Sequence, residues 1–184
     1  MEEKDVEFNI KFINPQAVIS ELEIGAGMLV GDFGCGTGYF TFPLAKVVGQ
    51  TGRVYALDIL KDKLEAIESQ AKLLGLGNIS TRRVNLETAG GSKLDDASLD
   101  WVFLVNMLFQ NKNKAIIVQE ARRVLKPGGK ILVIEWNKKD ASFGPANNLR
   151  VAEEEISQLI QANSLSVIKK ISISDFHFGL IFEK

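Results

Sequence analysis

Residues 31–40 read GDFGCGTGYF and directly follow the short apolar stretch Met-Leu-Val at residues 28–30. Glycine weakens strands and helices because it loses more conformational freedom on folding than any other residue. A cluster of glycines after an apolar strand therefore marks a place where the backbone turns sharply or lies very close to a ligand. The glycines concerned are Gly31, Gly34, Gly36 and Gly38. We call residues 34–38 the glycine loop.

The sequence on both sides of the glycine loop alternates between strand-like and helix-like patterns. Apolar, strand-like runs occupy residues 28–33, 53–60, 79–86, 100–108 and 130–136. Helical periodicity is found at residues 39–48, 60–74 and 112–125. The fourth apolar run is almost continuous, which is typical of a strand covered on both faces. Strands that alternate with helices predict an α/β fold with a parallel sheet.

The C-terminal part of the sequence departs from this alternation. A helix is predicted at residues 150–162, and two strand-like segments at 164–174 and 177–184 are separated by a very short turn at Asp175. So short a connection permits only an antiparallel pair, because a parallel crossover needs about a dozen residues. We therefore predict a doubly wound, mostly parallel sheet with one reversed strand. No internal repeat or linker interrupts the sequence, so a single domain is expected over residues 1–184.

The composition excludes several classes of protein. With 22 basic and 23 acidic residues the net charge is -1, which makes a broad nucleic-acid interface unlikely. The single cysteine, Cys35, excludes an intrachain disulfide and a cysteine-cluster zinc site. The N-terminus is acidic and mixed, and no apolar run approaches the roughly 20 residues that span a bilayer. A cytoplasmic protein without a membrane span is expected.

The spacing of the glycines separates the possible cofactors. A dinucleotide fingerprint beginning at Gly34 would need a small third residue where Tyr39 stands, and the Lys-Ser/Thr pair of a phosphate-binding loop is absent. The loop instead has glycine at every second position from 34 to 38 and follows Asp32. An acidic residue beside the loop suits a ligand with positive charge better than it suits a pyrophosphate.

The next two predicted strands end in residues suited to a nucleoside. Asp58, at the end of the second strand, can accept hydrogen bonds from both ribose hydroxyls. At the end of the third strand, the Asn85 amide oxygen can accept from the exocyclic amine of adenine, and the Leu86 N–H can donate to a ring nitrogen. A positive group near Asp32, a ribose at Asp58 and an adenine near Asn85 together describe S-adenosylmethionine.

Four motifs then resemble those of the class I S-adenosylmethionine-dependent methyltransferases. VGDFGCGTG (30–38) resembles motif I, and VYALDI (54–59) resembles the acidic motif of the second strand. DDASLDWVFLVNMLF (95–109) resembles the fourth-strand motif, and EARRVLKPGGKILVIEW (120–136) is similar to the motif leading into the fifth strand. All four follow the family order. The chain is most similar to the branch of ubiquinone/menaquinone-biosynthesis C-methyltransferase-like proteins.

The resemblance implies a fold and a cofactor, and the sequence also departs from the family pattern in some places. It implies a Rossmann-like, doubly wound, seven-stranded sheet of order 3-2-1-4-5-7-6 with strand 7 antiparallel, and S-adenosyl-L-methionine as the cofactor. Asn85 stands where the family usually has Asp, and GGSK (90–93) lengthens the following loop. Much of the N-terminal cap of the family is missing, so we expect an acceptor site that is exposed or completed by a partner, and a homodimer is possible.

Residues for the cofactor and the acceptor are carried over from these motifs. The predicted cofactor-binding residues are Asp32, Gly34, Cys35, Gly36, Gly38, Asp58, Ile59, Asn85, Leu86 and Asn106, with Cys35 interpreted as a packing residue. No catalytic residue is assigned and no metal is expected. The candidates for the acceptor pocket are Asn106, Phe109, Gln110, Trp136, Arg150 and His177. A structural role is favoured for His177. For Arg150 two interpretations stay open: it pairs with an anionic acceptor, or it is a solvated arginine at the start of a helix.

The predicted activity is methyl transfer from S-adenosylmethionine by in-line displacement. A small-molecule acceptor is favoured because Asn-Met-Leu-Phe stands at 106–109 instead of the Asn/Asp-Pro-Pro-Tyr motif of amino-methylating enzymes. The alternatives are an RNA or protein methyltransferase, and a non-catalytic cofactor-binding or partner subunit with the same fold. A nicotinamide-dependent oxidoreductase is disfavoured by Tyr39 and by the lack of a substrate domain.

Overall fold

A computed structural model of the chain describes residues 12–139 and 143–184. Its strands are β1 (Leu29–Phe33), β2 (Arg53–Asp58), β3 (Ile79–Arg83), β4 (Leu99–Val105), β5 (Leu125–Trp136), β6 (Ser166–Ser174) and β7 (His177–Glu183). Its helices are α1 (Pro15–Ser20), α2 (Thr41–Val48), α3 (Lys61–Leu73), α4 (Lys114–Val124) and α5 (Glu153–Gln161), with short 3-10 turns η1 (Leu108–Gln110) and η2 (Asn147–Leu149).

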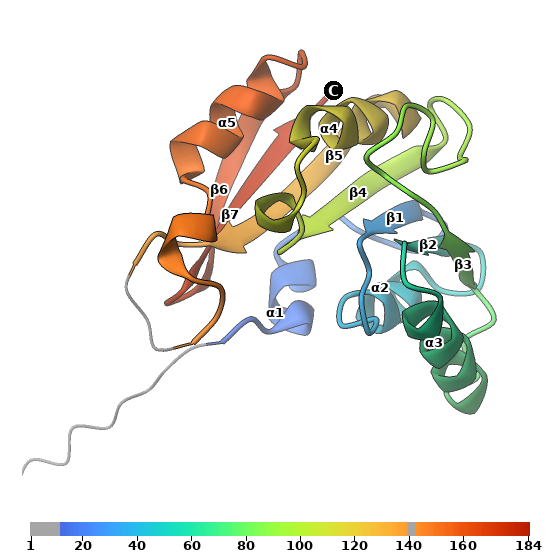
Figure 1. Cartoon of the computed structure of the whole chain (residues 1–184). Coiled ribbons are helices and arrows are strands. Elements are labelled where there is room, and N and C mark those ends of the chain that lie inside the picture. The colour runs from blue at the N-terminus through green and yellow to red at the C-terminus, as the bar shows by residue number, and fades with distance from the viewer. Residues whose placement is uncertain (1–11, 140–142) are drawn as a thin grey trace, which may run out of the picture.

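The strands form one seven-stranded sheet of order β3-β2-β1-β4-β5-β7-β6 (Figure 1). β1 pairs in parallel with β2 and β4, and the parallel arrangement continues to β3 on one side and β5 on the other. β7 is antiparallel to both β5 and β6. The strand order and the reversed strand expected from the family resemblance are therefore confirmed.

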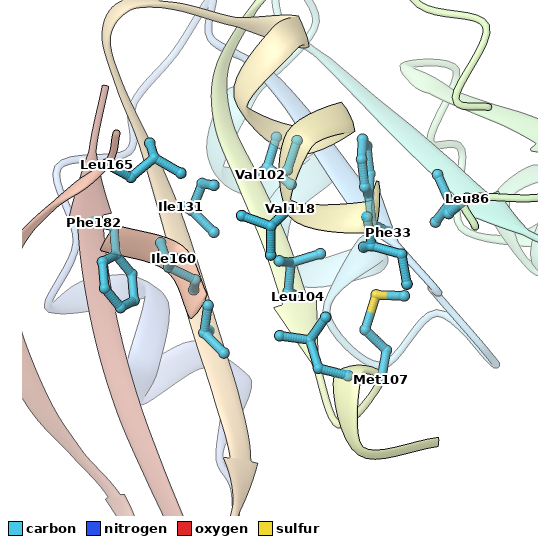
Figure 2. Close-up of a cluster of buried hydrophobic side chains, with 14 of the residues drawn as sticks. Phe33, Leu86, Val102, Leu104, Met107, Val118, Ile131, Ile160, Leu165 and Phe182 are labelled. Carbon is cyan, nitrogen blue, oxygen red and sulfur yellow. The ribbon is translucent and has the colours of Figure 1, made fainter. Parts of the chain in front are cut away.

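Helices cover both faces of the sheet. α4 and α5 lie on one face, whereas α1, α2 and α3 lie on the other (Figure 1). Side chains alternate between these faces along β4: Val102 and Leu104 pack in the cluster shared with α4 and α5, and Trp101 and Phe103 pack in the cluster shared with α1 and α2. Figure 2 shows the first of these clusters, which continues to Met107 at the end of β4. Burial on both faces explains the continuous apolar run in β4.

Some boundaries differ from the predictions. The helix predicted at residues 60–74 is α3, and its two expected end residues, Leu60 and Leu74, are capping residues that are 51% and 45% exposed. The last helix begins at Glu153 instead of residue 150. β5 begins at Leu125, five residues before the predicted start, because Leu125 pairs with Leu99 of β4. The sequence KPGG is therefore part of a strand and not only the end of a helix.

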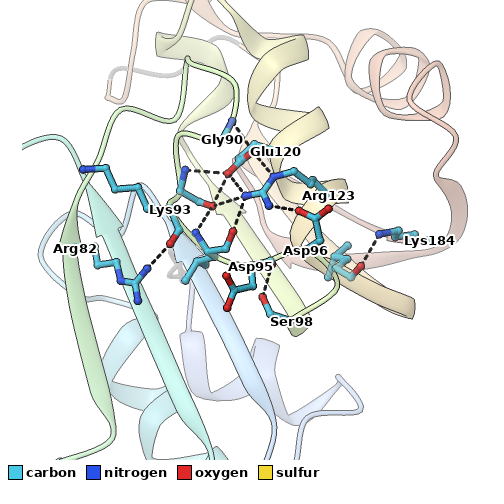
Figure 3. A network of polar contacts seen from close by, with 12 residues as sticks. Arg82, Gly90, Lys93, Asp95, Asp96, Ser98, Glu120, Arg123 and Lys184 are labelled. Carbon is cyan, nitrogen blue, oxygen red and sulfur yellow. Dashed lines mark hydrogen bonds and ion pairs between the residues drawn. The ribbon is translucent and has the colours of Figure 1, made fainter.

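A polar network holds the long loop that leads into β4 (Figure 3). Glu120 of α4 is 3% exposed, and its carboxylate accepts hydrogen bonds from the N–H groups of Gly90 (3.1 Å) and Ser92 (2.9 Å). Arg123 pairs with Glu120 at 2.7 Å and also with Asp96. The inserted GGSK residues are thus fixed to α4. Over the described residues, no helix has the length and apolar character needed to cross a membrane.

Candidate cofactor site

A cavity of about 320 Å³ lies at the carboxyl ends of β1, β2 and β3. It is lined by six of the predicted cofactor-binding residues: Gly34, Gly36, Asp58, Ile59, Asn85 and Leu86. In open α/β sheets this edge is where ligands bind, because the loops that follow the strands meet there. The structure therefore brings residues from three separate segments of the sequence to one cavity, which we call the cofactor pocket.

The glycine loop forms one side of the cofactor pocket. Gly34 and Gly36 have φ angles of 72° and 53°, a region that side-chain-bearing residues rarely adopt. A Cβ on Gly34 would lie 3.3 Å from Cβ of Met107, whereas a Cβ on Gly36 would meet no atom within 4 Å. The backbone at Gly34 is thus packed against the end of β4. The backbone at Gly36 faces open space that a ligand can occupy.

Asp58 joins the glycine loop to the start of α3. Its carboxylate accepts one hydrogen bond from the Gly36 N–H and another from the Leu60 N–H, each at 2.9 Å. The two bonds use different oxygens, Oδ2 and Oδ1. Since a carboxylate offers about four lone-pair positions, both oxygens can still accept from hydroxyl groups of a ligand. The side chain is half-buried and lines the pocket, so it is accessible to such a ligand.

Four predicted cofactor residues do not line the cofactor pocket. Asp32 is 3% exposed and accepts a hydrogen bond from the Thr41 hydroxyl at 2.6 Å. Burial raises the pKa of Asp32 to about 6, although the Thr41 bond lowers it. Cys35 is buried with Ala56, and burial raises the pKa of its thiol, in agreement with a packing role. The other two are Gly38, which lines a separate hollow beside α1, and Asn106.

The third strand supplies a polar and an apolar group. Asn85 is exposed, and its amide oxygen accepts a hydrogen bond from the Glu87 N–H at 2.9 Å. One lone pair of that oxygen therefore remains for a ligand. Leu86 is 7% exposed and presents an apolar surface to the cavity.

The pocket also contains residues that were not predicted for it. They are Leu60, Lys63, Val84, Glu87, Met107 and Asn111, together with Gln110, which was expected at the acceptor pocket. Met107 and Asn111 belong to the segment after β4, whose position at the carboxyl edge could have indicated them. Lys63 is the third residue of α3 and carries no comparable signal in the sequence.

Most of the candidates for the acceptor pocket lie together beyond β4. The Asn106 amide nitrogen is 3.3 Å from Nε2 of His177, and the rings of His177 and Trp136 are 4.0 Å apart between centroids. The Arg150 guanidinium lies 5.4 Å from the centre of the Trp136 ring. Phe109 is separate from this group and packs, half-buried, against the core cluster of α4 and α5.

His177 is buried and has partners at both ring nitrogens. It is 5% exposed, and Nδ1 lies 2.8 Å from the Ser174 hydroxyl, which also accepts from the Phe176 N–H. Burial and, to a smaller extent, the positive charge of Arg150 lower the pKa of His177 to about 4. The imidazole is therefore neutral near pH 7. Its two contacts make it a structural residue more than a free proton acceptor.

Arg150 holds the loop between β5 and α5. It is 3% exposed and donates hydrogen bonds to the carbonyl oxygens of Asn137, Lys139, Phe143 and Pro145 at 2.6–3.0 Å. The interpretation as a solvated arginine at a helix start is therefore wrong, because α5 begins at Glu153 and the guanidinium points into the loop. All three of its nitrogens already donate to the main chain.

Comparison with known proteins agrees with this architecture. The family profile described as a methyltransferase domain matches residues 24–175. The ubiquinone/menaquinone biosynthesis C-methyltransferase of Haemophilus ducreyi is 32% identical over 146 residues, which cover 79% of this chain and 51% of that protein. The arsenite methyltransferase of Aquipseudomonas alcaligenes is 30% identical over 109 residues, covering 57% and 32%.

A solved structure matches the fold over almost its whole length. The S-adenosylmethionine-dependent methyltransferase of Aquifex aeolicus superposes with a TM-score of 0.86 at 24% identity, covering 94% of this chain and 90% of the other. By contrast, the chain spans about half the length of the first curated relatives it matches. The order of the motifs, the sheet topology and the profile match agree with one another. This chain is a member of the methyltransferase domain family.

Proposed function

We propose that the chain binds S-adenosylmethionine in the cofactor pocket and transfers its methyl group to a small molecule. The observation that carries the proposal is the position of Asp58, which faces the cavity from the end of β2 and contacts the glycine loop through Gly36. A carboxylate at this place in an open α/β sheet suits the two hydroxyls of a ribose.

The other residues of the pocket fit the remaining parts of the cofactor. Ile59 and Leu86 offer apolar surface for the adenine ring, and the free lone pair of Asn85 suits its exocyclic amine. The open space beside Gly36 suits the sugar and the start of the methionine part. Asp32 is buried against Thr41 and does not line the pocket, so it would favour the positive groups of the cofactor only through its charge.

The cofactor would supply an electrophilic methyl group on a sulfonium, so the protein needs to align the acceptor and exclude water. We place the acceptor near Asn106, Trp136 and Gln110, beyond the end of β4. A small-molecule acceptor is supported by the names of the relatives, a quinone-biosynthesis C-methyltransferase and an arsenite methyltransferase. The homodimer and the cytoplasmic location stay predictions.

Calorimetric titration with S-adenosylmethionine, S-adenosylhomocysteine and NAD tests the cofactor. We expect the first two to bind the wild-type protein and NAD not to bind. Asp58→Ala should lose about 1–3 kcal/mol of binding free energy, because hydrogen bonds to a charged group are lost. Asp95→Ala, which removes an exposed acid before β4, is the matched control and should bind normally. Binding of NAD, or no binding to a folded wild-type protein, would refute the proposal.

A further inference from the structure

Glu135 is a buried carboxylate at the carboxyl end of β5 that the proposed reaction does not use. Its exposed fraction is 0%, and it is paired with Phe178 in the neighbouring strand β7. An ionisable side chain is rarely buried so completely unless it is hydrogen-bonded or paired. The partners of Glu135 therefore indicate what it does.

The partners of Glu135 belong to the turn after β4. Its Oε1 accepts a hydrogen bond from the Leu108 N–H at 2.6 Å, while Oε2 has no partner among the described residues. Burial raises the pKa of Glu135 to about 7, and the N–H groups of Leu108, Phe109 and Met107 act against this rise. Lys114 of α4 also lowers the pKa through its charge. The carboxylate thus faces the N-terminal N–H groups of η1, as a capping group does.

The turn held by Glu135 forms one wall of the cofactor pocket. Met107, Gln110 and Asn111 line the cavity, and Met107 is the residue against which Gly34 packs. Within the turn, the Asn111 amide donates to the Met107 carbonyl at 2.7 Å, and the Gln110 amide donates to the Asn106 carbonyl at 3.1 Å. These bonds fix the turn internally. At η1 the bond from the Leu108 N–H to Glu135 attaches the turn to β5, in addition to the burial of the Leu108 side chain in the core cluster.

We propose that Glu135 is a positioning residue that holds the 107–111 turn in the place where it completes the cofactor pocket. The inference rests on the proposed function, since it assigns Glu135 a role in the pocket where S-adenosylmethionine would bind. Glu135 does not touch the cavity itself; it acts through the main chain of Leu108. Any side chain that keeps an acceptor oxygen at that position should preserve the pocket, and one that lacks it should not.

Two substitutions separate the hydrogen bond from mere packing. Glu135→Gln keeps an acceptor oxygen, whereas Glu135→Met fills a similar volume without one. We expect Glu135→Met to weaken S-adenosylhomocysteine binding about tenfold in calorimetric titration, because a charged hydrogen bond is lost. Glu135→Gln should bind within about threefold of the wild-type protein. Glu120→Gln is the matched control: it alters another buried carboxylate that accepts main-chain N–H groups, at a loop outside the pocket, and should bind normally.

Amide hydrogen exchange gives a second readout that needs no cofactor. In Glu135→Met the amides of residues 107–111 should exchange faster than in Glu135→Gln, while those of β1 and β2 change little. A folded Glu135→Met protein with unchanged affinity and unchanged exchange would overturn the inference while leaving the proposed function intact. A wild-type protein that binds no S-adenosylhomocysteine would overturn both. If Glu135→Met does not fold, Glu135→Ala, which also lacks an acceptor oxygen, takes its place: faster exchange at 107–111 than in Glu135→Gln supports the inference, and equal exchange in the two variants overturns it.

Discussion

His177 shows how burial of one side chain makes stability depend on pH. Its folded-state pKa of about 4 lies below the ordinary value of 6.5, so the unfolded chain binds a proton more readily than the native protein. The neutral imidazole therefore contributes stability that is complete above pH 6.5 and is lost as pH falls towards 4. A shift of this size corresponds to about 3 kcal/mol.

The measurement is the difference between two profiles of unfolding free energy against pH, for the wild-type protein and His177→Gln. The difference isolates His177. The raised pKa values of Asp32 and Glu135 change the unfolding free energy in the opposite direction between pH 4 and 7, but both groups are present in both proteins, so their contributions cancel in the difference. We expect the advantage of the wild type to shrink between pH 6.5 and 4. A constant difference over that range would contradict the burial effect.

Arg150 is expected to contribute to the stability of the fold more than to the binding of an anion. Arg150→Met removes the donors that hold four carbonyl oxygens of the loop after β5, and these partly buried acceptors lose their side-chain partner. We expect a loss of about 2–4 kcal/mol in urea denaturation. Arg53→Met, at an exposed position of β2, is the control and should change stability by less than about 0.5 kcal/mol. Equal effects of the two substitutions would count against the role given to Arg150.

Single residues were predictable from sequence where the main chain determines their place. Gly34 directly follows the last residue of β1, Gly36 lies two residues further on, and Asp58 is the last residue of β2; strand ends of this kind can be found from the apolar pattern. Asp32 was expected to face the cofactor, but its side chain turns to Thr41. Which side of a loop a side chain occupies depends on packing from distant segments, and sequence spacing does not carry that information.

At the scale of elements, alanine substitutions at two positions of the glycine loop should have different effects on stability and on ligand binding. Gly34→Ala and Gly36→Ala both place a side chain at positive φ, at a cost of about 1–2 kcal/mol of folding free energy. Gly34→Ala additionally crowds Met107, so it should lower the unfolding free energy more than Gly36→Ala does. Gly36→Ala should instead weaken S-adenosylhomocysteine binding, because its methyl group enters the open space of the pocket. Thermal melts and calorimetry compare the two variants, and identical behaviour would contradict this assignment.

The positions of the elements were predictable, but several of their ends were not. Alternation of apolar runs and helical periods was sufficient to find every strand of the sheet. The start of β5 was misplaced because Pro127 and the two following glycines are typical of a helix end, whereas pairing with Leu99 extends the strand back to Leu125. Here pairing with a strand residue 26 positions earlier in the chain outweighs the local sequence signal for a helix end.

At the scale of the whole molecule, the paired carboxylate Glu120 should define the acid limit of stability. Glu120 is buried, but hydrogen bonds from Arg123 and Ser92 outweigh that burial and lower its pKa to about 2. A carboxylate with a lowered pKa stabilises the fold above its ordinary value near 4.5, and this contribution is lost as pH falls towards 2. In a circular-dichroism titration with acid, we expect Glu120→Gln to lose the part of the unfolding transition that Glu120 causes between pH 4.5 and 2. An unchanged transition below pH 4.5 would contradict it.

The placement of β7 between β5 and β6 has a consequence for how the protein is made. A ribosome completes β5 about 40 residues before β7, so one side of β5 has no neighbour while the intervening segment is translated. Phe178, Leu180 and Phe182, which belong to the main core cluster, also arrive only then. The nascent chain therefore carries an open apolar edge until β7 has been made, and this is the interval in which a chaperone would have most to protect.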